Sequence, residues 1–429
     1  MYISAIKKKR KKLRRKMVFY AFITLITLII TVKIYYSFSR EYLLNYLGEF
    51  YFDEKYYIEH YPEIKSSNIN PYKHYTTIGW VQDKNPNSNF DTKFFKNMYM
   101  LNHFNKHNLN PLAFFARSRL FFDKLMTKPS QVKKVEKLAR PKNYLAIVAV
   151  FQNEARFMKE WIEFYKLNGV EKFYLYNHRS NDNFQEILDP YIKDGIVELR
   201  HEKQEPLNRK DWNRIQTKIY EAVAKETSNT TEWLLVLDLD EFLFPTFKTT
   251  LKEALSEYEE YAAVSAGWVL FGSNQIEKIP DHQLMIDTLT QFIDKDNPNV
   301  KTIVRPRCVE SITHPHYPIL KKGFAQVDEN KEYFTGPFLP DKLARNLLRI
   351  NHYVERDLSF YREEKLTRVH MKTSDHLDQD YKEKIIQELI QKSSLLPAEN
   401  IDHTIQKYSN RLRIMMGFDE NTQKDPKDE

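Results

Sequence analysis

The fold is decided by the stretch YLAIVAVF, residues 144–151. A continuous apolar run of this kind is typical of a strand in a sheet that is buried on both faces. Alternating apolar runs and amphipathic segments follow it. They predict helices at residues 154–168, 183–193 and 211–227, and strands at residues 172–177, 196–199 and 233–237. This order predicts an α/β fold with a mostly parallel sheet and right-handed crossovers.

An acidic turn follows the strand expected at residues 233–237. It contains Asp238, Asp240 and Glu241, and a second apolar run, residues 242–245, comes directly after it. Asp-x-Asp triplets also occur at residues 294–296 and 378–380, in charged stretches typical of solvated surface. Ligands of open parallel sheets bind at the carboxyl ends of the strands. We therefore expect the loops after the strands to meet in one crevice that contains the acidic turn.

The acidic turn needs a positive partner, because carboxylates between two apolar runs are costly to bury alone. No Lys or Arg lies within residues 233–245. Mg²⁺ and Mn²⁺ prefer oxygen ligands, and they commonly take one or two carboxylates while substrate phosphates complete their shell. We predict an Mn²⁺ or Mg²⁺ site at Asp238 and Asp240, where the ion would stabilise a departing diphosphate. The alternative is a capped strand end without a metal.

Basic charge is concentrated at the amino terminus. Nine of the 66 Lys and Arg residues lie between Lys7 and Lys16, and the remaining ones nearly equal the 58 acidic residues in number. The neutral body argues against nucleic-acid binding, whereas the basic tail suits anionic lipid headgroups.

The apolar run at residues 17–38 has the length of about 20 residues that crosses a bilayer as a helix. We predict a single-pass membrane anchor with a cytoplasmic amino terminus, the alternative being a helix that lies on the membrane surface. The side that holds the body stays open.

An internal repeat follows this predicted anchor. FDEKYY at residues 52–57 returns as FDTKFF at residues 90–95, and an Asn-Pro pair occurs in each copy, at residues 70–71 and 110–111. Each copy predicts a helix with an Asp N-cap, a turn and a second short helix. The expected domains are a basic tail at residues 1–16, the anchor at 17–38, a small α-helical module at 49–125, an α/β domain at 143–370 and a helical, polar tail at 371–429.

Several short motifs occur in a fixed order within the predicted α/β domain. They are Asn153-Glu154, Glu160-Trp161, Tyr174-Leu175-Tyr176, Ser180-Asn181-Asp182, Gln216 with Tyr220, Asp238-Leu239-Asp240-Glu241-Phe242, Phe271-Gly272-Ser273, Arg305-Pro306 and Asn351-His352-Tyr353. This order resembles that of the GT-A-fold transferases of glycosyltransferase family 92 and their bacterial family 2-like relatives. The chain departs from the family's usual residues at Asn177-His178, Asn274-Gln275 and Arg356-Asp357.

The resemblance implies a GT-A fold and a metal-dependent, inverting transfer of a hexose from a nucleotide-diphosphate sugar, with UDP expected, to a glycan or polysaccharide. It implies that Asp238 and Asp240 hold the metal, with His352 as a later ligand. The residues that it places at the nucleotide sugar are Asn153, Glu154, Asp182, Gln216 and Asp238. His352 can equally be interpreted as a structural histidine, and the imidazoles of His314 and His316 are alternative candidates for the metal ligand.

An inverting transfer also needs a general base, a carboxylate within reach of the acceptor hydroxyl. Glu277 and Glu310 are the candidates, and each can also be interpreted as a surface residue.

Two other functions remain open. A metal phosphoesterase would use the same carboxylates but would want further His and Asp ligands for a second metal. A non-catalytic membrane-anchored scaffold would bind glycan through residues 49–125 and carry a degenerate transferase domain.

Overall fold

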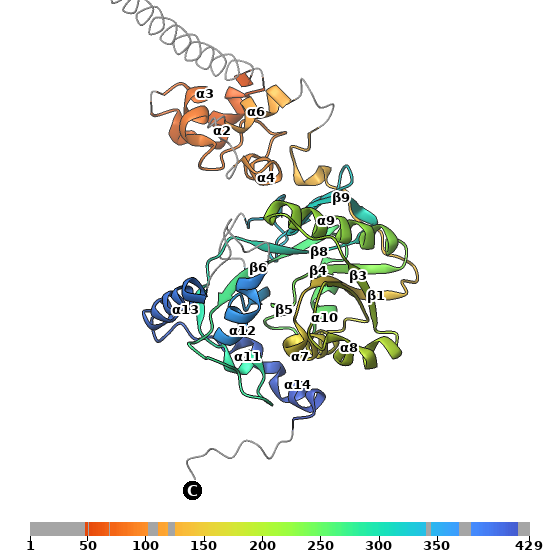
Figure 1. Cartoon of the computed structure of the whole chain (residues 1–429). Helices are drawn as coiled ribbons and strands as arrows, with labels where there is room; N and C mark the ends of the chain where they lie inside the picture. The colour runs from red at the N-terminus through yellow and green to blue at the C-terminus, as the bar shows by residue number, and fades with distance from the viewer. Residues whose placement is uncertain are drawn as a thin grey trace, which may run out of the picture. The chain divides into compact units, whose positions relative to one another are not determined.

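The computed structural model describes residues 48–49, 51–67, 69–101, 110–118, 125–339, 345–368 and 379–418. The chain divides into two compact units: one comprises Met1–Lys96 and Leu101–Pro129, and the other Asn97–Met100 and Ser130–Glu429 (Figure 1). The predicted tail and anchor, residues 1–38, lie outside the described residues. Within the described part, no helix has both the length and the apolarity needed to cross a bilayer.

The first unit contains short helices that are capped in the same way in both copies of the repeat. The α-helices whose bounds the structure describes in this unit are α2 (Glu54–His60), α3 (Pro71–His74), α4 (Thr92–Met98) and α6 (Pro111–Ser118). The carboxylate of Asp53 accepts the backbone N–H of Tyr56 at 2.9 Å, and Asp91 accepts that of Phe94 at 2.8 Å. The predicted Asp N-caps are therefore present, and each satisfies a backbone donor that the helix start leaves free.

The second unit is built on a sheet whose first half is parallel. Strands β1 (Asn143–Phe151), β2 (Lys172–His178), β3 (Val197–Glu202) and β4 (Thr231–Val236) lie in the order β3-β2-β1-β4, and each adjacent pair is parallel. This part confirms the predicted α/β class and the parallel arrangement. The carboxyl ends of β1 and β4 consequently lie side by side, and the acidic turn follows β4.

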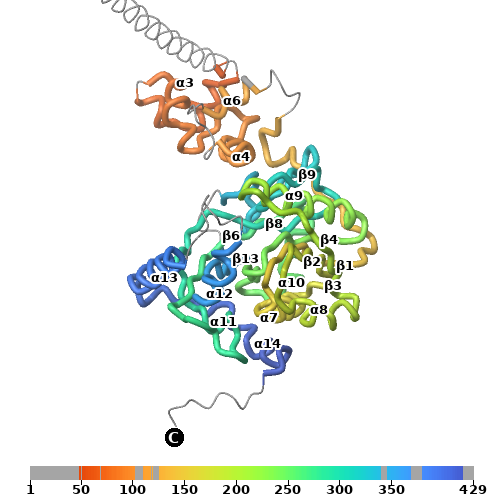
Figure 2. The backbone as a smooth tube through the Cα atoms, in the orientation of Figure 1, coloured from red at the N-terminus to blue at the C-terminus, as the bar shows by residue number. Residues whose placement is uncertain are grey.

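The other half of the sheet is mixed. Strand β8 (Val300–Val304) runs antiparallel between β4 and β6 (Ala263–Phe271). Strand β13 (Leu348–His352) pairs parallel with β6 and antiparallel with β5 (Glu241–Pro245); β6 and β13 are labelled on the trace in Figure 2. Smaller strands complete this half: β7 (Phe292–Asp294), β11 (Gln326–Val327) and β12 (Tyr333–Phe334). A separate hairpin joins β9 (Val309–His314) to β10 (Tyr317–Leu320).

Helices cover both faces of the parallel half. Figure 1 shows α9 (Arg209–Glu226) on one side of the sheet, and α7 (Ala155–Leu167) and α8 (Phe184–Lys193) on the other. Alternate residues of β1 enter two different apolar clusters, Ile147 with the α7 side and Val148 with the α9 side. The remaining α-helices of this unit are α10 (Leu251–Leu255), α11 (Met285–Thr288), α12 (Leu358–Glu363), α13 (Gln379–Ser394) and α14 (Ser409–Met416). Burial on both faces explains why β1 reads as an uninterrupted apolar run.

Candidate functional site

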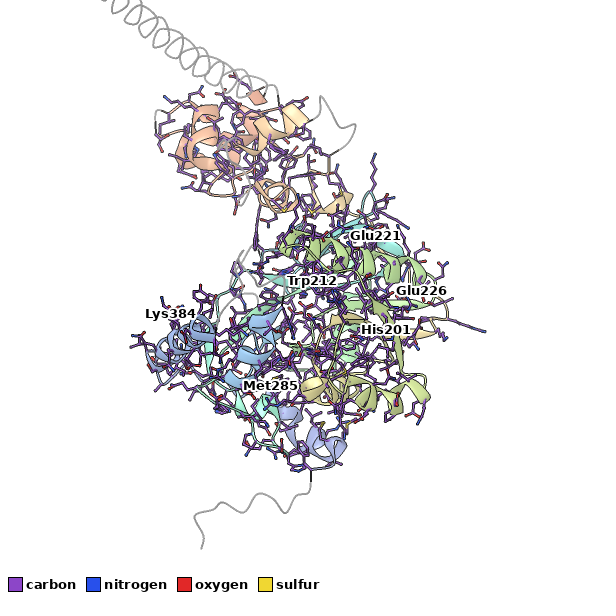
Figure 3. All side chains as sticks on the ribbon, viewed as in Figure 1. His201, Trp212, Glu221, Glu226, Met285 and Lys384 are labelled. Carbon is purple, nitrogen blue, oxygen red and sulfur yellow. The ribbon has the colours of Figure 1, made fainter. Side chains whose placement is uncertain are left out.

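A cavity of about 390 Å³ opens at the carboxyl ends of β1 and β4. Its volume lies within the range of roughly 300–1,000 Å³ that is common for ligand pockets. Trp212, labelled in Figure 3, comes from α9 and lines the cavity. The predicted site residues that line it are Glu154, Gln216, Asp238, Asp240 and His352. The loops after β1 and β4 therefore meet in one crevice, as the strand order predicted, whereas no described residue of the loop after β2 lines it.

The acidic turn at the floor of this cavity is fixed by its own backbone and by α7. The backbone N–H of Asp238 donates to the Glu241 carboxylate at 2.9 Å, and that of Glu241 donates to the Asp238 carbonyl at 3.1 Å. The Glu241 carbonyl accepts from Trp161 Nε1 at 3.0 Å and from the Tyr165 hydroxyl at 2.9 Å. Trp161 and Tyr165 of α7 therefore hold the turn in place.

Two lysines from distant parts of the chain neutralise the turn. Lys301 of β8 is only 1% exposed, and its Nζ lies 2.9 Å from Asp238 Oδ2 and 3.4 Å from Glu241 Oε2. Lys365, in a short 3-10 helix (Lys365–Thr367), places its Nζ 2.5 Å from Asp240 Oδ2. The sequence suggested that no basic side chain lies beside the turn. This prediction is wrong, because Lys301 and Lys365 are far from the turn in the sequence and reach it only in the folded structure. Burial of the carboxylates alone consequently does not require a metal.

The pKa values of Asp240 and Glu241 in the acidic turn are shifted in opposite directions. Burial alone would raise the pKa of Asp240, but Lys365 and His352 hold it well below its usual range. Burial raises the pKa of Glu241 well above its usual range; Lys301 opposes this shift, while the charges of Asp238 and Asp240 reinforce it. Asp240 is therefore ionised and suited to a cation, whereas Glu241 is a structural member of the turn.

The residues beside Asp240 fit a metal whose shell is completed by a substrate. His352 Nε2 lies 3.5 Å from Asp240 Oδ1, so the two side chains offer one nitrogen and one oxygen. Among the described residues, no group of three His, Cys, Asp or Glu side chains is placed to hold a metal ion. Mg²⁺ is commonly bound by one or two carboxylates together with substrate phosphates, and such a site needs few protein ligands.

Glu154 and Gln216 line the cavity, but their side chains already have protein partners. The two carboxylate oxygens of Glu154 accept from Arg356 Nη2 at 2.6 Å and from Arg368 Nη2 at 2.8 Å. Gln216 Nε2 donates to the Tyr220 hydroxyl at 3.3 Å. In this arrangement Glu154 positions Arg368, which also lines the cavity, so a role toward a nucleotide would be shared with that arginine.

Asn153 and Asp182 lie next to the cavity without lining it. Asn153 Oδ1 accepts from the backbone N–H of Asn181 at 2.9 Å, and Asp182 Oδ2 accepts from that of Ala155 at 2.7 Å. These bonds tie the loop after β1 to the loop after β2. Asp182 Oδ1 is buried and has no hydrogen-bond partner, which leaves it one oxygen for a ligand.

The structure does not bring the two base candidates into the cavity. Glu277 has a side chain that is 63% exposed and accepts from Arg362 Nη1 at 2.6 Å. Glu310 is exposed on β9, and neither residue lines the cavity. The competing imidazoles, His314 and His316, do line it.

Two of the three departures from the family's residues have structural explanations. Asn274 and Gln275 have φ angles of 53° and 60°, so they keep the left-handed backbone that glycine adopts easily. Arg356 is fully buried against Glu154, and Asp357 caps α12 by accepting the backbone N–H of Phe360 at 2.9 Å. These positions support the loops around the cavity.

Sequence reasoning missed Lys301, Lys365, Arg368 and Trp268 as residues of the site. Lys301 left a signal, because it is a lone charge within the apolar strand VKTIV at residues 300–304. A buried lysine is rare unless it is paired. Lys365 and Arg368 left none, since they occur in an ordinary charged stretch and reach the site only through the fold.

Comparison with known proteins gives a family. A model described as glycosyltransferase family 92 matches residues 147–389. Family 92 proteins of Ricinus communis and Arabidopsis thaliana are both 23% identical to the chain, over 231 and 235 residues. Each match covers 52% of this chain, but only 38% and 37% of those relatives' lengths. Among solved structures, TarS of S. aureus in complex with UDP is similar at 14% identity and a TM-score of 0.26, over 38% of this chain and 47% of that chain.

Proposed function

The chain belongs to glycosyltransferase family 92, and on that premise we propose that it transfers a hexose from a nucleotide-diphosphate sugar to a glycan acceptor. UDP is the expected nucleotide and inversion the expected outcome. The observation that carries the proposal is the cavity at the ends of β1 and β4, which gathers Asp238, Asp240 and His352 beside Glu154 and Gln216. Ligands of parallel α/β sheets bind at this edge.

The proposed chemistry rests on the charges at the acidic turn. Mn²⁺ or Mg²⁺, when bound, would supply the positive charge that stabilises a leaving diphosphate. Asp240 and His352 are the residues that would hold the ion. Lys365 and Arg368 line the cavity close to Asp240 and Glu154, and their fixed positive charges would attract and orient the diphosphate.

The membrane part of the proposal rests on the sequence alone. A single-pass anchor at residues 17–38, with the basic tail at residues 1–16 beside anionic lipid, would tether the transferase domain to a membrane. Such a tether would suit a polymeric acceptor that is also made or held at a membrane.

The proposed activity is testable with purified full-length protein in detergent. UDP-sugars would be incubated with Mn²⁺, and released UDP would be measured by chromatography. We expect slow hydrolysis of at least one UDP-sugar, its loss in chelator, and a decrease of at least about 100-fold in Asp240→Asn, because the variant loses the charge that would hold the ion.

The matched control is Asp296→Asn, which alters an exposed member of another Asp-x-Asp triplet and should leave hydrolysis unchanged. Thermal unfolding of each variant would show whether it remains folded. Full activity of Asp240→Asn in chelator would contradict the proposal. Calorimetry with UDP and Mn²⁺ separates the scaffold alternative, since a degenerate site should give no metal-dependent heat.

A further inference from the structure

One wall of the cavity is a row of four rings, His314, His316, Trp268 and His352, called the ring row below. The ring centroids of His314 and His316 are 5.1 Å apart, those of His316 and Trp268 are 4.9 Å apart, and those of Trp268 and His352 are 4.4 Å apart. All four residues line the cavity. Because His352 lies beside Asp240, the row begins at the acidic turn and leads away from it.

The ring row is held by several elements of the mixed half of the sheet. His314 and His316 flank Pro315 in the turn between β9 and β10, where His314 Nδ1 accepts from the backbone N–H of His316 at 3.2 Å. The His316 carbonyl accepts from the Thr302 hydroxyl of β8 at 2.8 Å. Trp268 stands in β6 opposite Ile350 of β13. Because these rings stand on strands and on a turn that is held by hydrogen bonds, they form a preorganised surface.

The ring row carries buried polar atoms that lack hydrogen-bond partners. Trp268 Nε1 and His316 Nδ1 are both buried and have no hydrogen-bond partner in the structure. An unpaired buried donor or acceptor costs about 1–3 kcal/mol, so such atoms are uncommon unless a ligand or water completes them. Burial, with the charge of Lys301, lowers the pKa of His316 to about 2, and its ring is therefore neutral at physiological pH.

A pyranose ring has the two properties that such a wall would recognise. Its C–H groups form an apolar face that packs against aromatic rings, and its hydroxyls both donate and accept hydrogen bonds. A charged ligand would find no counter-charge on Trp268 or on the neutral ring of His316. Several rings in succession, each about one ring-width from the next, suit more than one sugar unit.

We propose that the ring row binds the acceptor glycan, with neutral sugar units lying along Trp268 and His316 outward from Asp240. The proposal rests on the transferase function above and adds where the acceptor binds. The donor's diphosphate would lie at Asp240 and Glu154, where Lys365 and Arg368 carry positive charge, and the ring row leads away from that place. The ring row, which contains neither of these two cations, is therefore the wall that we assign to the acceptor.

The test uses the full-length protein with UDP and Mn²⁺, and methyl β-D-glucopyranoside and methyl β-D-galactopyranoside as probes in saturation-transfer NMR. We expect saturation of one face of at least one glycoside by the wild type. Trp268→Leu should lower that signal at least about fivefold, and Trp268→Phe should lower it less, because phenylalanine keeps the ring but not the N–H. Calorimetry would show that both variants still bind UDP.

The matched control is Phe247→Leu, which removes an aromatic ring that is 82% exposed and outside this cavity, and it should keep the full glycoside signal. Equal signals from Trp268→Leu and the wild type would overturn the proposal. So would a wild type that binds UDP but saturates neither glycoside, or a Trp268→Leu variant that loses UDP and glycoside binding together. A wild type that does not bind UDP would instead contradict the proposed function.

Discussion

The two halves of the sheet contribute different things to the cavity. In the parallel half, polar side chains at the strand ends bond to neighbouring backbone, as Asn153 and Asp182 do between the loops after β1 and β2. In the mixed half, the side chains that reach the site are a buried cation and rings: Lys301, Trp268 and His352. The parallel half therefore sets the position of the acidic turn, whereas the mixed half supplies its charge balance and a binding wall.

The side chain of Lys301 joins the two halves of the sheet. Its ammonium, buried in β8, lies between the carboxylates of Asp238 and Glu241, which follow β4. Burial alone would lower the pKa of Lys301, but these carboxylates raise it above its usual range. Each partner would be costly to bury without the other, so the contact links the stability of both halves.

Removal of the Lys301 charge should have the largest effect on stability. Lys301→Met leaves Asp238 Oδ2 and Glu241 Oε2 without the ammonium that faces them, and breaking a buried pair in this way costs about 3–5 kcal/mol. Urea unfolding followed by tryptophan fluorescence would measure the change in free energy. We expect the double variant Lys301→Met/Asp238→Asn to recover part of the loss, because it removes the carboxylate charge that Lys301 contacts at 2.9 Å.

A surface pair provides the control for Lys301→Met. Lys248 pairs with Glu257, and both side chains are nearly half exposed, so Lys248→Met should unfold like the wild type. If Lys301→Met were as stable as Lys248→Met, the mixed half would not be needed to balance the turn, and the contrast between the two halves would fail.

The next largest effect should come from α7, which fixes the turn from the parallel side. The Tyr165 hydroxyl donates to the Glu241 carbonyl and accepts from the backbone N–H of Leu243 at 2.7 Å. Tyr165→Phe leaves that buried N–H unpaired, while Trp161 still donates to the carbonyl. We expect a loss of about 1–3 kcal/mol in the same unfolding experiment.

The control for this variant is Tyr51→Phe, because the Tyr51 ring is 38% exposed and belongs to the first unit. Its unfolding free energy should match that of the wild type. A Tyr165→Phe variant as stable as Tyr51→Phe would show that α7 does not fix the turn through this hydroxyl.

The parallel half was largely predictable from the sequence because its signals are local. The helix expected at residues 211–227 is α9 (Arg209–Glu226), and the strand expected at 144–151 is β1 (Asn143–Phe151). The strand expected at 196–199 extends to Glu202, because β3 is an edge strand whose second half is polar and leaves no apolar signal.

The mixed half was less predictable because its elements depend on tertiary pairing. Strands as short as β11 (Gln326–Val327) and β12 (Tyr333–Phe334) carry no periodic pattern of their own. The same reason hid part of the site. Asp238 and Asp240 stand directly after an apolar strand and could be found, whereas Lys365 and Trp268 reach the cavity only after distant strands pair.

The smallest effect concerns a second link between the halves, which lacks a counter-charge. Glu160 of α7 accepts the backbone N–H groups of Met285 and Ile286, at 2.9 and 3.1 Å. Burial raises its pKa to about 7, although these two donors oppose the shift. The unfolded value is about 4.3, so the folded state binds the extra proton between the two values.

Stability from Glu160 is therefore fully present below about pH 4.3 and is lost as the pH rises through 7. The loss is at most about 1.4 kcal/mol per pH unit, because one proton is involved. Glu160→Gln does not titrate, and we expect its unfolding free energy to fall less steeply than that of the wild type across this window. Parallel pH curves of the unfolding free energy for the two proteins would show that burial does not raise the pKa of the Glu160 carboxyl. The halves would then be linked electrostatically through Lys301 and not through Glu160.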